Sequence, residues 1–388
     1  MRMAKSQSGF TLLELMIGSF IGLLVILSMA SLFKAGMDVS FAVTQRAETQ
    51  ANMRTAIELM SKDISQAGAG LPAGGLQLVS GGTASKYGCD QTGVCYVVNH
   101  TYPNSPSGTA NYMYGIIPGP TNGVEGGVTI PNASSLPNAS ITAIYCDYSF
   151  PLTNFTFTFT NPNTVTVGTI GTMDTTLPTN IAQAGGLNIG DLLLFTVVGA
   201  GTTSEGSTPI QKGTAVGEIT GTPQMGLSGI VMAAGDKLNF NQTTGNNDLS
   251  QVASADLPAN NPTMTVCRLN VVTYFLQIPA AGGTIQNPRL MRQVNGLSPV
   301  PVADNIINLQ IAYDLVDSQT GYLDADLVDP IGAGQLPSLI QKVDLWVMGE
   351  SLISKGNKSQ NMYLATAVAA RDMSFCNSYS NQTNACGN

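Results

Sequence analysis

The chain has 388 residues, of which 43% are hydrophobic and only 10% are charged. This length suits one large domain or two ordinary ones. The low charge, offset by abundant Gly, Thr, Asn and Ser, is typical of an exported β-rich protein with long polar loops. The net charge is −8 and no dense basic run is present, so the composition argues against DNA or RNA as the main partner.

The first 33 residues have the pattern of a membrane anchor. Arg2 and Lys5 lie in a short leading stretch, and the 19 residues from 15 to 33 carry no charge. That run matches the length of about 20 residues that a membrane-spanning helix needs. Basic residues ahead of the span predict a cytoplasmic N-terminus and an exported remainder. No small-residue cleavage site of an ordinary secretory signal follows the apolar run.

A helical pattern continues beyond this run, because apolar residues recur at spacings of four, three and four before Gly and Pro stop signals. The apolar stripe is Met53, Ile57, Met60 and Ile64, and the stop signals are Gly68, Gly70 and Pro72. One helix is predicted over 10–66, roughly 85 Å long at 1.5 Å per residue, with 10–33 as its membrane-spanning or filament-core part. We expect its first part to contact lipid or other helices and its later part to pack on a domain.

The segment SGFTLLELMIG resembles the prepilin-type (class III) signal of type IV pilins and type II secretion pseudopilins. The resemblance implies a leader peptide, 1–9, that a prepilin peptidase removes by cutting between Gly9 and Phe10, and N-methylation of Phe10. It also implies that Glu14, the fifth residue after the cut, meets the N-terminal amine of a neighbouring subunit during assembly. A carboxylate in an apolar helix needs such a partner, because a lone buried charge is costly.

The rest of the chain is predicted to be rich in strands. Strict alternation over 155–168 predicts a strand and a turn with one face buried, and the apolar run at 191–199 predicts a buried strand. The segment 266–279 is predicted to be a long strand with a hairpin partner at 287–296. The segment 302–317 is expected to form a short helix or turn and then a strand. Further strands are expected at 217–220, 229–233, 339–350 and 362–375.

These elements predict an α+β, type IV pilin-like fold, in which a long N-terminal helix packs on an antiparallel β-sheet head. The exported head is expected over 67–388. Within it, 73–262 is interpreted as a large loop- and strand-rich insertion, and 263–388 as the core sheet.

Two segments narrow the resemblance. MRTAIELMSKDISQAG, 53–68, and the strand series over 266–375 resemble the PilW group of minor pilins and the minor pseudopilin J of type II secretion. The resemblance implies a minor pilin in a tip complex that primes pilus assembly. Its partners would be prepilin peptidase, other minor pilins, the major pilin and the pilus assembly platform. It would cross the inner membrane once before assembly, and then lie in a pilus or pseudopilus, in the periplasm or at the cell surface.

Two alternatives remain open. A type II secretion pseudopilin would carry the same signal. A pilus-tip adhesin or DNA-uptake subunit would use the segment 73–262 to recognise a surface or ligand.

The six cysteines are even in number and none forms a C-x-x-C pair, which in an exported chain indicates disulfides. Six cysteines allow 15 sets of pairs. Cys89–Cys95 and Cys376–Cys386 are predicted because each closes a short polar loop, and Cys146–Cys267 is the remaining pair. Reduced, buried thiols are the alternative.

Catalytic patterns are absent from the sequence. His100, the one histidine, lies in a loop-like stretch without a nearby acid and is interpreted as a surface residue. No nucleophile elbow, phosphate-binding loop or zinc-protease motif occurs. We therefore expect no enzyme activity and no cofactor.

A group of acidic residues leaves one metal site open. Calcium takes six to eight oxygen ligands, and an acidic loop outside the cell could supply them, although the spacing departs from the EF-hand rule. A solvated acidic loop is the alternative. The candidate residues are Asp314, Asp317, Asp324, Asp326 and Asp329.

Overall fold

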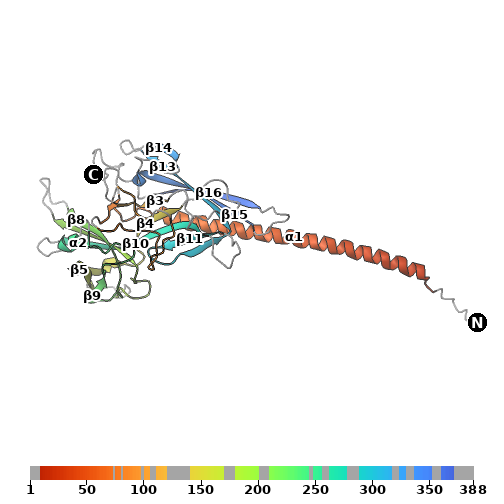
Figure 1. The fold of residues 1–388 in the computed structure, drawn as a ribbon, viewed down its shortest axis with the longest axis horizontal. Helices are drawn as coiled ribbons and strands as arrows, with labels where there is room; N and C mark the ends of the chain where they lie inside the picture. Colours follow the sequence, from red (N-terminus) through yellow and green to blue (C-terminus); the bar gives the residue numbers. More distant parts are fainter. Residues whose placement is uncertain are drawn as a thin grey trace, which may run out of the picture.

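The computed structural model consists of one long helix that projects from a β-rich head, with the N-terminus at the far end of the helix (Figure 1). The residues it describes are 9–72, 75–79, 82–97, 100–104, 111–119, 140–169, 180–200, 209–243, 248–255, 262–277, 288–316, 323–328, 336–351 and 360–370. An α+β architecture with a long N-terminal helix followed by antiparallel sheets confirms the predicted fold class.

The projecting helix is α1, Leu12–Ser65, which has 54 residues and is roughly 81 Å long at 1.5 Å per residue. It begins two residues later than predicted because Thr11 caps it: the Thr11 side chain accepts a hydrogen bond from the backbone N–H of Glu14. Lys62 lies in the last turn, where a positive charge favours the helix C-terminus. The glycines of its first half do not interrupt it.

Burial divides α1 into two parts. The side chains up to residue 48 are almost all exposed, and burial begins at Thr49. From there the predicted stripe faces the head, with Met53, Met60 and Ile64 at most 2% exposed. Burying each of these side chains contributes about 1.5–3 kcal/mol, so this face holds the helix to the head.

The largest sheet has seven strands. Its central strand, β10, is long enough to pair with β11 and β4 along its second half and with β7 along its first half. The strands are β3 (Ile116–Pro118), β4 (Ile141–Asp147), β7 (Leu192–Ala200), β8 (Pro209–Glu218), β10 (Pro262–Gln277), β11 (Arg289–Val294) and β12 (Val300–Asp304).

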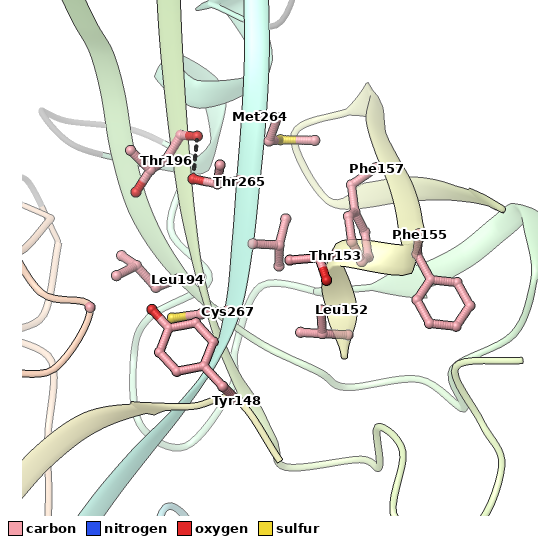
Figure 2. A pocket seen from close by; sticks show the side chains of 12 residues that line it. Tyr148, Leu152, Thr153, Phe155, Phe157, Leu194, Thr196, Met264, Thr265 and Cys267 are labelled. Carbon is pink, nitrogen blue, oxygen red and sulfur yellow. Dashed lines mark hydrogen bonds between the residues drawn. The ribbon is translucent and has the colours of Figure 1, made fainter. Parts of the chain in front are cut away.

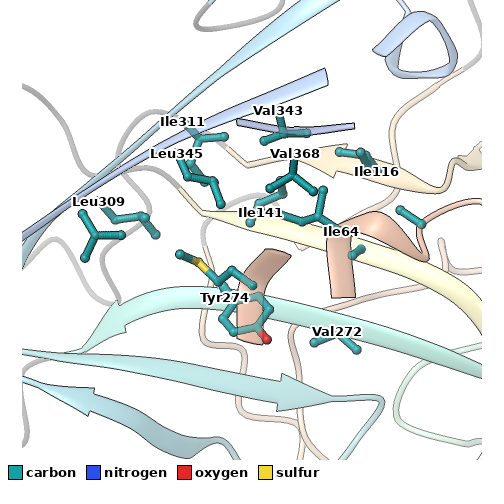
Figure 3. Close-up of a cluster of buried hydrophobic side chains, with 14 of the residues drawn as sticks. Ile64, Ile116, Ile141, Val272, Tyr274, Leu309, Ile311, Val343, Leu345 and Val368 are labelled. Carbon is teal, nitrogen blue, oxygen red and sulfur yellow. The ribbon is translucent and has the colours of Figure 1, made fainter. Parts of the chain in front are cut away.

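A second, four-stranded antiparallel sheet lies on the other side of the helix end. Its order is β14 (Leu323–Val328), β13 (Ile306–Val316), β15 (Ile340–Glu350) and β16 (Asn361–Ala369). Figure 3 shows the end of α1 between the two sheets, with Ile64 near Tyr274 and Val272 on one side and Val343 and Val368 on the other. The helix end is therefore a shared core element of both sheets.

The remaining elements form smaller units. A three-stranded sheet and α2 (Leu249–Ala255) pack around an apolar cluster that they share with β7 and β8 of the large sheet. It consists of β5 (Phe155–Asn161), β6 (Thr164–Thr169) and β9 (Gly226–Val231). A short ladder joins β1 (Leu76–Gln77) to β2 (Tyr112–Met113), and 3₁₀ turns occupy Leu152–Asn154 and Pro337–Leu339.

Several strand predictions are confirmed, including the hairpin of β10 with β11 and the strand-turn pattern of β5 with β6. The short helix or turn expected near residue 302 is wrong: β12 pairs there with β11, and β13 follows after one residue. The Pro and Asp of β12 weaken its strand pattern, but an edge strand tolerates both. Strand β4 and helix α2 were not predicted.

The segment 73–262 shares a sheet with the rest of the head. It supplies β3 and β4, and β4 pairs with β10 over seven consecutive residues. Ile141, Ala143 and Tyr145 of β4 belong to the cluster that buries the end of α1. Part of this segment therefore contributes directly to helix docking.

Candidate assembly site

The N-terminal end of α1 carries the residues that the sequence assigned to processing and assembly. Phe10 is 88% exposed. The Thr11 backbone N–H donates to Glu14 Oε2 at 3.2 Å, and the Glu14 N–H donates to Thr11 Oγ1 at 3.3 Å. This reciprocal pair is a capping box. The Glu14 carboxylate therefore already compensates the positive end of the helix dipole within its own chain.

The exposed part of α1 presents a continuous apolar surface. By length and composition α1 can cross a membrane, and none of its most apolar window is buried in the head. An apolar surface of this extent is stable only against lipid or against other helices. Its exposed large side chains within the uncharged run are Leu15, Met16, Ile17, Phe20, Ile21, Leu23, Leu24, Val25, Ile26, Leu27, Met29, Leu32 and Phe33.

Apolar exposure extends past Lys34, the first charge after this run. Met37, Val39, Phe41 and Val43 are between 46% and 64% exposed. These residues lie up to about 15 Å beyond Phe33 along the helix, at 1.5 Å per residue, and before the first buried residue of the head. This band is better placed to contact neighbouring helices than the lipid core.

A buried polar cluster fastens the other end of α1 to the head. Asp63 is 2% exposed and its carboxylate accepts hydrogen bonds from the Tyr145 hydroxyl at 2.8 Å and the Tyr274 hydroxyl at 2.5 Å. Arg292 completes the cluster, with Nε 2.8 Å and Nη2 3.3 Å from the two carboxylate oxygens. Burial, followed by the negative charge of Asp63, raises the pKa of both tyrosines. They therefore remain neutral donors.

A glycine sets the distance between α1 and β15. A Cβ atom at Gly349 would lie 2.8 Å from Thr49 Cγ2 and 3.1 Å from Met53 Sδ. Both atoms belong to the face of α1 that docks on the sheet, so the helix backbone approaches β15 this closely because position 349 has no side chain.

Two disulfides lie in the described part of the chain. Cys89 is joined to Cys95 and Cys146 to Cys267, which are two of the three pairs predicted from the sequence. The third pair, Cys376–Cys386, lies outside the described residues. The long-range bond joins β4 to β10 within the large sheet.

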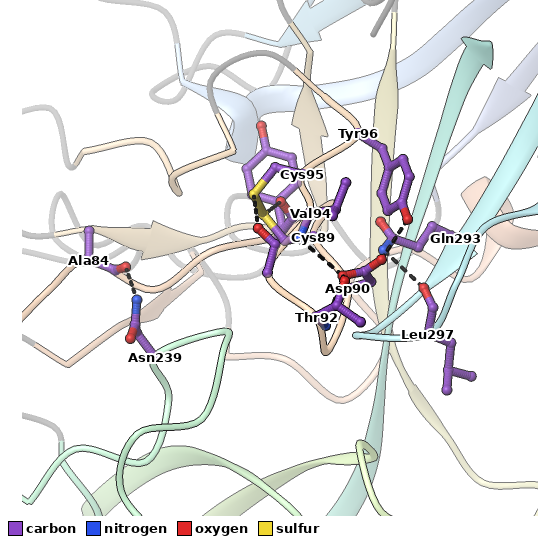
Figure 4. The surroundings of a disulfide bond; sticks show 12 residues. Ala84, Cys89, Asp90, Thr92, Val94, Cys95, Tyr96, Asn239, Gln293 and Leu297 are labelled. Atoms are coloured by element: carbon purple, nitrogen blue, oxygen red, sulfur yellow. Dashed lines mark hydrogen bonds between the residues drawn. A yellow bond between two sulfur atoms is a disulfide. The ribbon is translucent and has the colours of Figure 1, made fainter. Parts of the chain in front are cut away.

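The loop closed by Cys89 and Cys95 is also held by Asp90 (Figure 4). Its carboxylate accepts hydrogen bonds from the backbone N–H groups of Thr92 and Val94 and, at 2.5 Å, from the Tyr96 hydroxyl. Burial would raise the pKa of Asp90, but these hydrogen bonds outweigh burial and hold the pKa below its ordinary value. The loop is therefore fixed by polar contacts as well as by the disulfide.

The acidic residues proposed for calcium are placed only in part. Asp314 lies on β13, is buried, and forms an ion pair with Lys342, which also reaches Asp344 at 3.4 Å. Asp324 and Asp326 lie on β14, and Asp317 and Asp329 lie outside the described residues. Because Lys342 already supplies the positive charge near Asp314, this residue needs no metal ion for compensation. Calcium binding by the group stays a prediction.

His100 lies near the Cys89–Cys95 disulfide. Burial and the nearby charge of Lys86 lower its pKa, so the imidazole is neutral at neutral pH. The two sulfur atoms are bonded to each other and are not thiolates, so they cannot join His100 as metal ligands in the oxidised state.

A cavity of about 430 Å³ opens between β7 and β10 on one side and the Leu152–Asn154 turn with β5 on the other (Figure 2). Phe155, Phe157 and Met264 supply apolar surface, and Thr153 and Thr196 supply hydroxyl groups. None of its lining residues carries an acidic or basic side chain. The cavity can bind an uncharged group but offers no acid–base pair for catalysis.

Sequence reasoning missed the contacts that matter most for docking. Asp63 lies near the end of the apolar stripe as an ordinary helix-end acid, and only its position three residues after buried Met60 signals that it faces the head. No local pattern identifies Arg292 or Tyr145 as its partners.

Comparison with known families finds a match to the prokaryotic N-terminal methylation motif over residues 4–30. No curated protein and no solved structure matches the chain. The matched residues contain the Gly9–Phe10 junction and Glu14, and they run into the exposed part of α1. The chain thus carries a prepilin-type N-terminal methylation motif on a long apolar helix, the signal of a pilin or pseudopilin subunit that prepilin peptidase processes and that is anchored in the membrane before assembly.

Proposed function

We propose that the protein is a minor type IV pilin of the PilW kind, which enters a pilus as part of a tip complex that primes assembly. The observation that supports this proposal is the division of α1: its signal-bearing part, up to residue 48, is exposed and largely apolar, while its last part, from Thr49, packs into a large head. The exposed apolar part leaves lipid for a bundle of pilin helices, and the head remains outside. Prepilin peptidase, other minor pilins, the major pilin and the assembly platform are the proposed partners.

The proposed route begins in the inner membrane, with the N-terminus in the cytoplasm. Cleavage after Gly9 frees the amine of Phe10, which is then methylated. Glu14 pairs with the amine of a neighbouring subunit as the apolar surfaces meet, because a carboxylate leaving water for a helix bundle requires a compensating charge. Small residues such as Gly18 and Gly22 allow close helix approach.

Mass spectrometry of the mature chain and of sheared pili tests the proposal. We expect an N-methylated Phe10 at the N-terminus and the chain present in pili at far below the abundance of the major subunit. Deleting the gene should reduce the number of pili per cell. An uncut N-terminus, or normal piliation without the gene, would contradict the proposal.

A pseudopilin of type II secretion is the main alternative, because the same signal serves both machines. Loss of protein secretion with unchanged piliation in the deletion strain would favour it. The uncharged cavity between β7, β10 and β5 favours a second alternative, an adhesin or uptake subunit at the pilus tip. Filling that cavity should then abolish adhesion or uptake while piliation stays normal.

A further inference from the structure

Strand β16 forms one edge of the four-stranded sheet, and among the described residues only β15 pairs with it. The pairing covers all nine residues of β16 without a register shift. Backbone hydrogen bonds at both ends show which residues of this segment direct their backbone groups towards β15. Ser351 N–H donates to Gln360 O and Ala370 N–H donates to Gln341 O, each at 3.0 Å.

These two hydrogen bonds determine which backbone groups of β16 face outwards. In an antiparallel ladder, residues alternate between bonding their partner strand and pointing away from it. Because positions 360 and 370 bond β15, the even-numbered residues between them do so too. The odd-numbered residues direct their N–H and C=O groups to the open edge; they are Asn361, Tyr363, Ala365, Ala367 and Ala369.

The side chains of these residues leave the edge open to a further strand. All five are exposed, Tyr363 by 77%, and three of them are alanines. No charge, proline or bulge occurs in β16. An uncharged, regular and exposed edge of this length is a template for strand addition.

The opposite edge of the same sheet has the usual protection. Strand β14 contains Asp324 and Asp326, and its pairing with β13 is interrupted by register shifts. The edge strands of the large sheet carry Pro301 and Asp304 in β12, Pro118 in β3, and Pro209, Lys212 and Glu218 in β8. Strands β5 and β9 are also uncharged, but β5 packs against α2 and β10. The outer side of β9 already accepts backbone hydrogen bonds, from Thr220 N–H to Val231 O and from Gln224 N–H to Gly229 O. Among the described strands, the open edge of β16 is therefore a specific feature and not a general property of the head.

The position of β16 points to its occupant. It packs along α1, and Gln50 Nε2 lies 3.8 Å from Met362 Sδ. Figure 1 shows β15 and β16 beside α1 where the helix leaves the head. The exposed apolar band that ends at Val43 lies about two turns before this contact. A subunit whose helix packs on that band is thus placed beside the edge.

We propose that the edge of β16 accepts an uncharged extended strand from the head of the neighbouring subunit, so that assembly joins the two heads through a shared sheet as well as through their helices. This inference rests on the proposed function, because it assigns the head contact of that same assembly. An uncharged strand fits because a charged one would lose hydration at the alanine-lined edge.

The matched variants are Ala365→Pro and Ala365→Thr in the full chain. Proline removes one outward N–H and leaves the ladder to β15 intact, whereas threonine keeps the N–H and favours a strand. We expect Ala365→Pro to be processed normally but recovered in sheared filaments about tenfold less, since one lost hydrogen bond and a steric clash are together worth about 1.4 kcal/mol. Ala365→Thr should match the wild type. Equal recovery of both variants would overturn the proposal.

Two further measurements separate this inference from the proposed function. Hydrogen exchange on the full chain in detergent should show fast exchange at the odd-numbered amides of β16 and slow exchange at the even-numbered ones. Protection at the odd positions would mean that the chain covers its own edge, and the inference would fail whatever the protein does.

A photo-cross-linking residue at position 367 should capture an uncharged segment of another subunit. Capture of only the chain's own residues, or of no protein, would also overturn it. Absence of the wild-type chain from filaments would refute only the proposed function.

Discussion

Asp63 of α1 and Arg292 of β11 form an ion pair, with Nε 2.8 Å from Oδ2, in the last turn of the long helix inside the head. The Asp63 side chain is 3% exposed, and its carboxylate also accepts hydrogen bonds from two tyrosine hydroxyls. A single side chain thus connects the helix to β4, β10 and β11. This cluster fixes the position of the helix end relative to the large sheet.

Replacing Asp63 with Ala should destabilise the head by about 3–5 kcal/mol, because removing one partner of a buried ion pair leaves the other charge uncompensated. Urea unfolding measures the loss. Tyr145→Phe is the matched control: it removes one hydrogen bond to the same carboxylate and should cost about 1 kcal/mol. A loss of under 1 kcal/mol for Asp63→Ala would show that the cluster does not anchor the helix.

Replacing Gly349 with Val should destabilise the docked helix by about 1–3 kcal/mol, because the new side chain overlaps Thr49 and Met53 on α1 and the packed face must shift. Thermal unfolding followed by circular dichroism provides the measurement. Gly36→Ala is the control, since nothing lies within 4 Å of a Cβ atom there. If both variants melt alike, the close approach at β15 is unimportant for stability.

The pH dependence of stability should report on Glu218. This residue is 1% exposed, its neighbour Asp236 is also buried, and Gln91 donates to its carboxylate. Burial, reinforced by the charge of Asp236, raises the pKa of Glu218 to about 7 from an ordinary value of 4.5. The folded state therefore prefers the protonated acid, and its stability should fall as the pH rises from 4.5 to 7.

The variant Glu218→Gln keeps the shape of the side chain and removes this titration. We expect it to match the wild type at pH 4 and to be more stable by about 3 kcal/mol at pH 8, at 1.36 kcal/mol for each unit of pKa. Chemical unfolding across this pH range decides the matter. A variant whose stability still declines between pH 4.5 and 7 as steeply as the wild type's would assign the effect to another group.

The two disulfides should differ in their contribution to stability. The bond from Cys146 to Cys267 spans 121 residues, whereas the bond from Cys89 to Cys95 spans 6. Loop-closure entropy predicts losses of about 5 and about 2.4 kcal/mol when the respective pairs are changed to Ser. Denaturant titration of the two double variants measures these losses. A larger loss for the short loop would point to its hydrogen bonds through Asp90.

Glu14 has two roles that one substitution separates. Gln at this position can still complete a capping box with Thr11 but carries no charge. We expect Glu14→Gln to be cut by prepilin peptidase and to remain in the membrane, with strongly reduced recovery in filaments. Immunoblots of membrane and filament fractions provide the measurement. Normal recovery would mean that the carboxylate serves only as a helix cap.

Local sequence determined the long helix, its exposed apolar half and its processing signal. The uncharged run is continuous in the sequence, and the stripe from Met53 to Ile64 repeats at helical spacing. Both patterns involve neighbouring residues, so α1 was predicted to within two residues at each end. The hairpin of β10 and β11 could be predicted for the same reason, since its two strands are close in the chain.

Only the tertiary structure decided the pairings between distant segments. Strand β4 joins β10 across 121 residues of sequence at the Cys146–Cys267 bond, and β12 is a strand because β11 offers it an edge. The partners of Asp63 and the open edge of β16 follow from such pairings. The physical reason is that helix periodicity is encoded between residues three or four apart, whereas the place of a strand depends on which other strands compete for the same hydrogen bonds and buried faces.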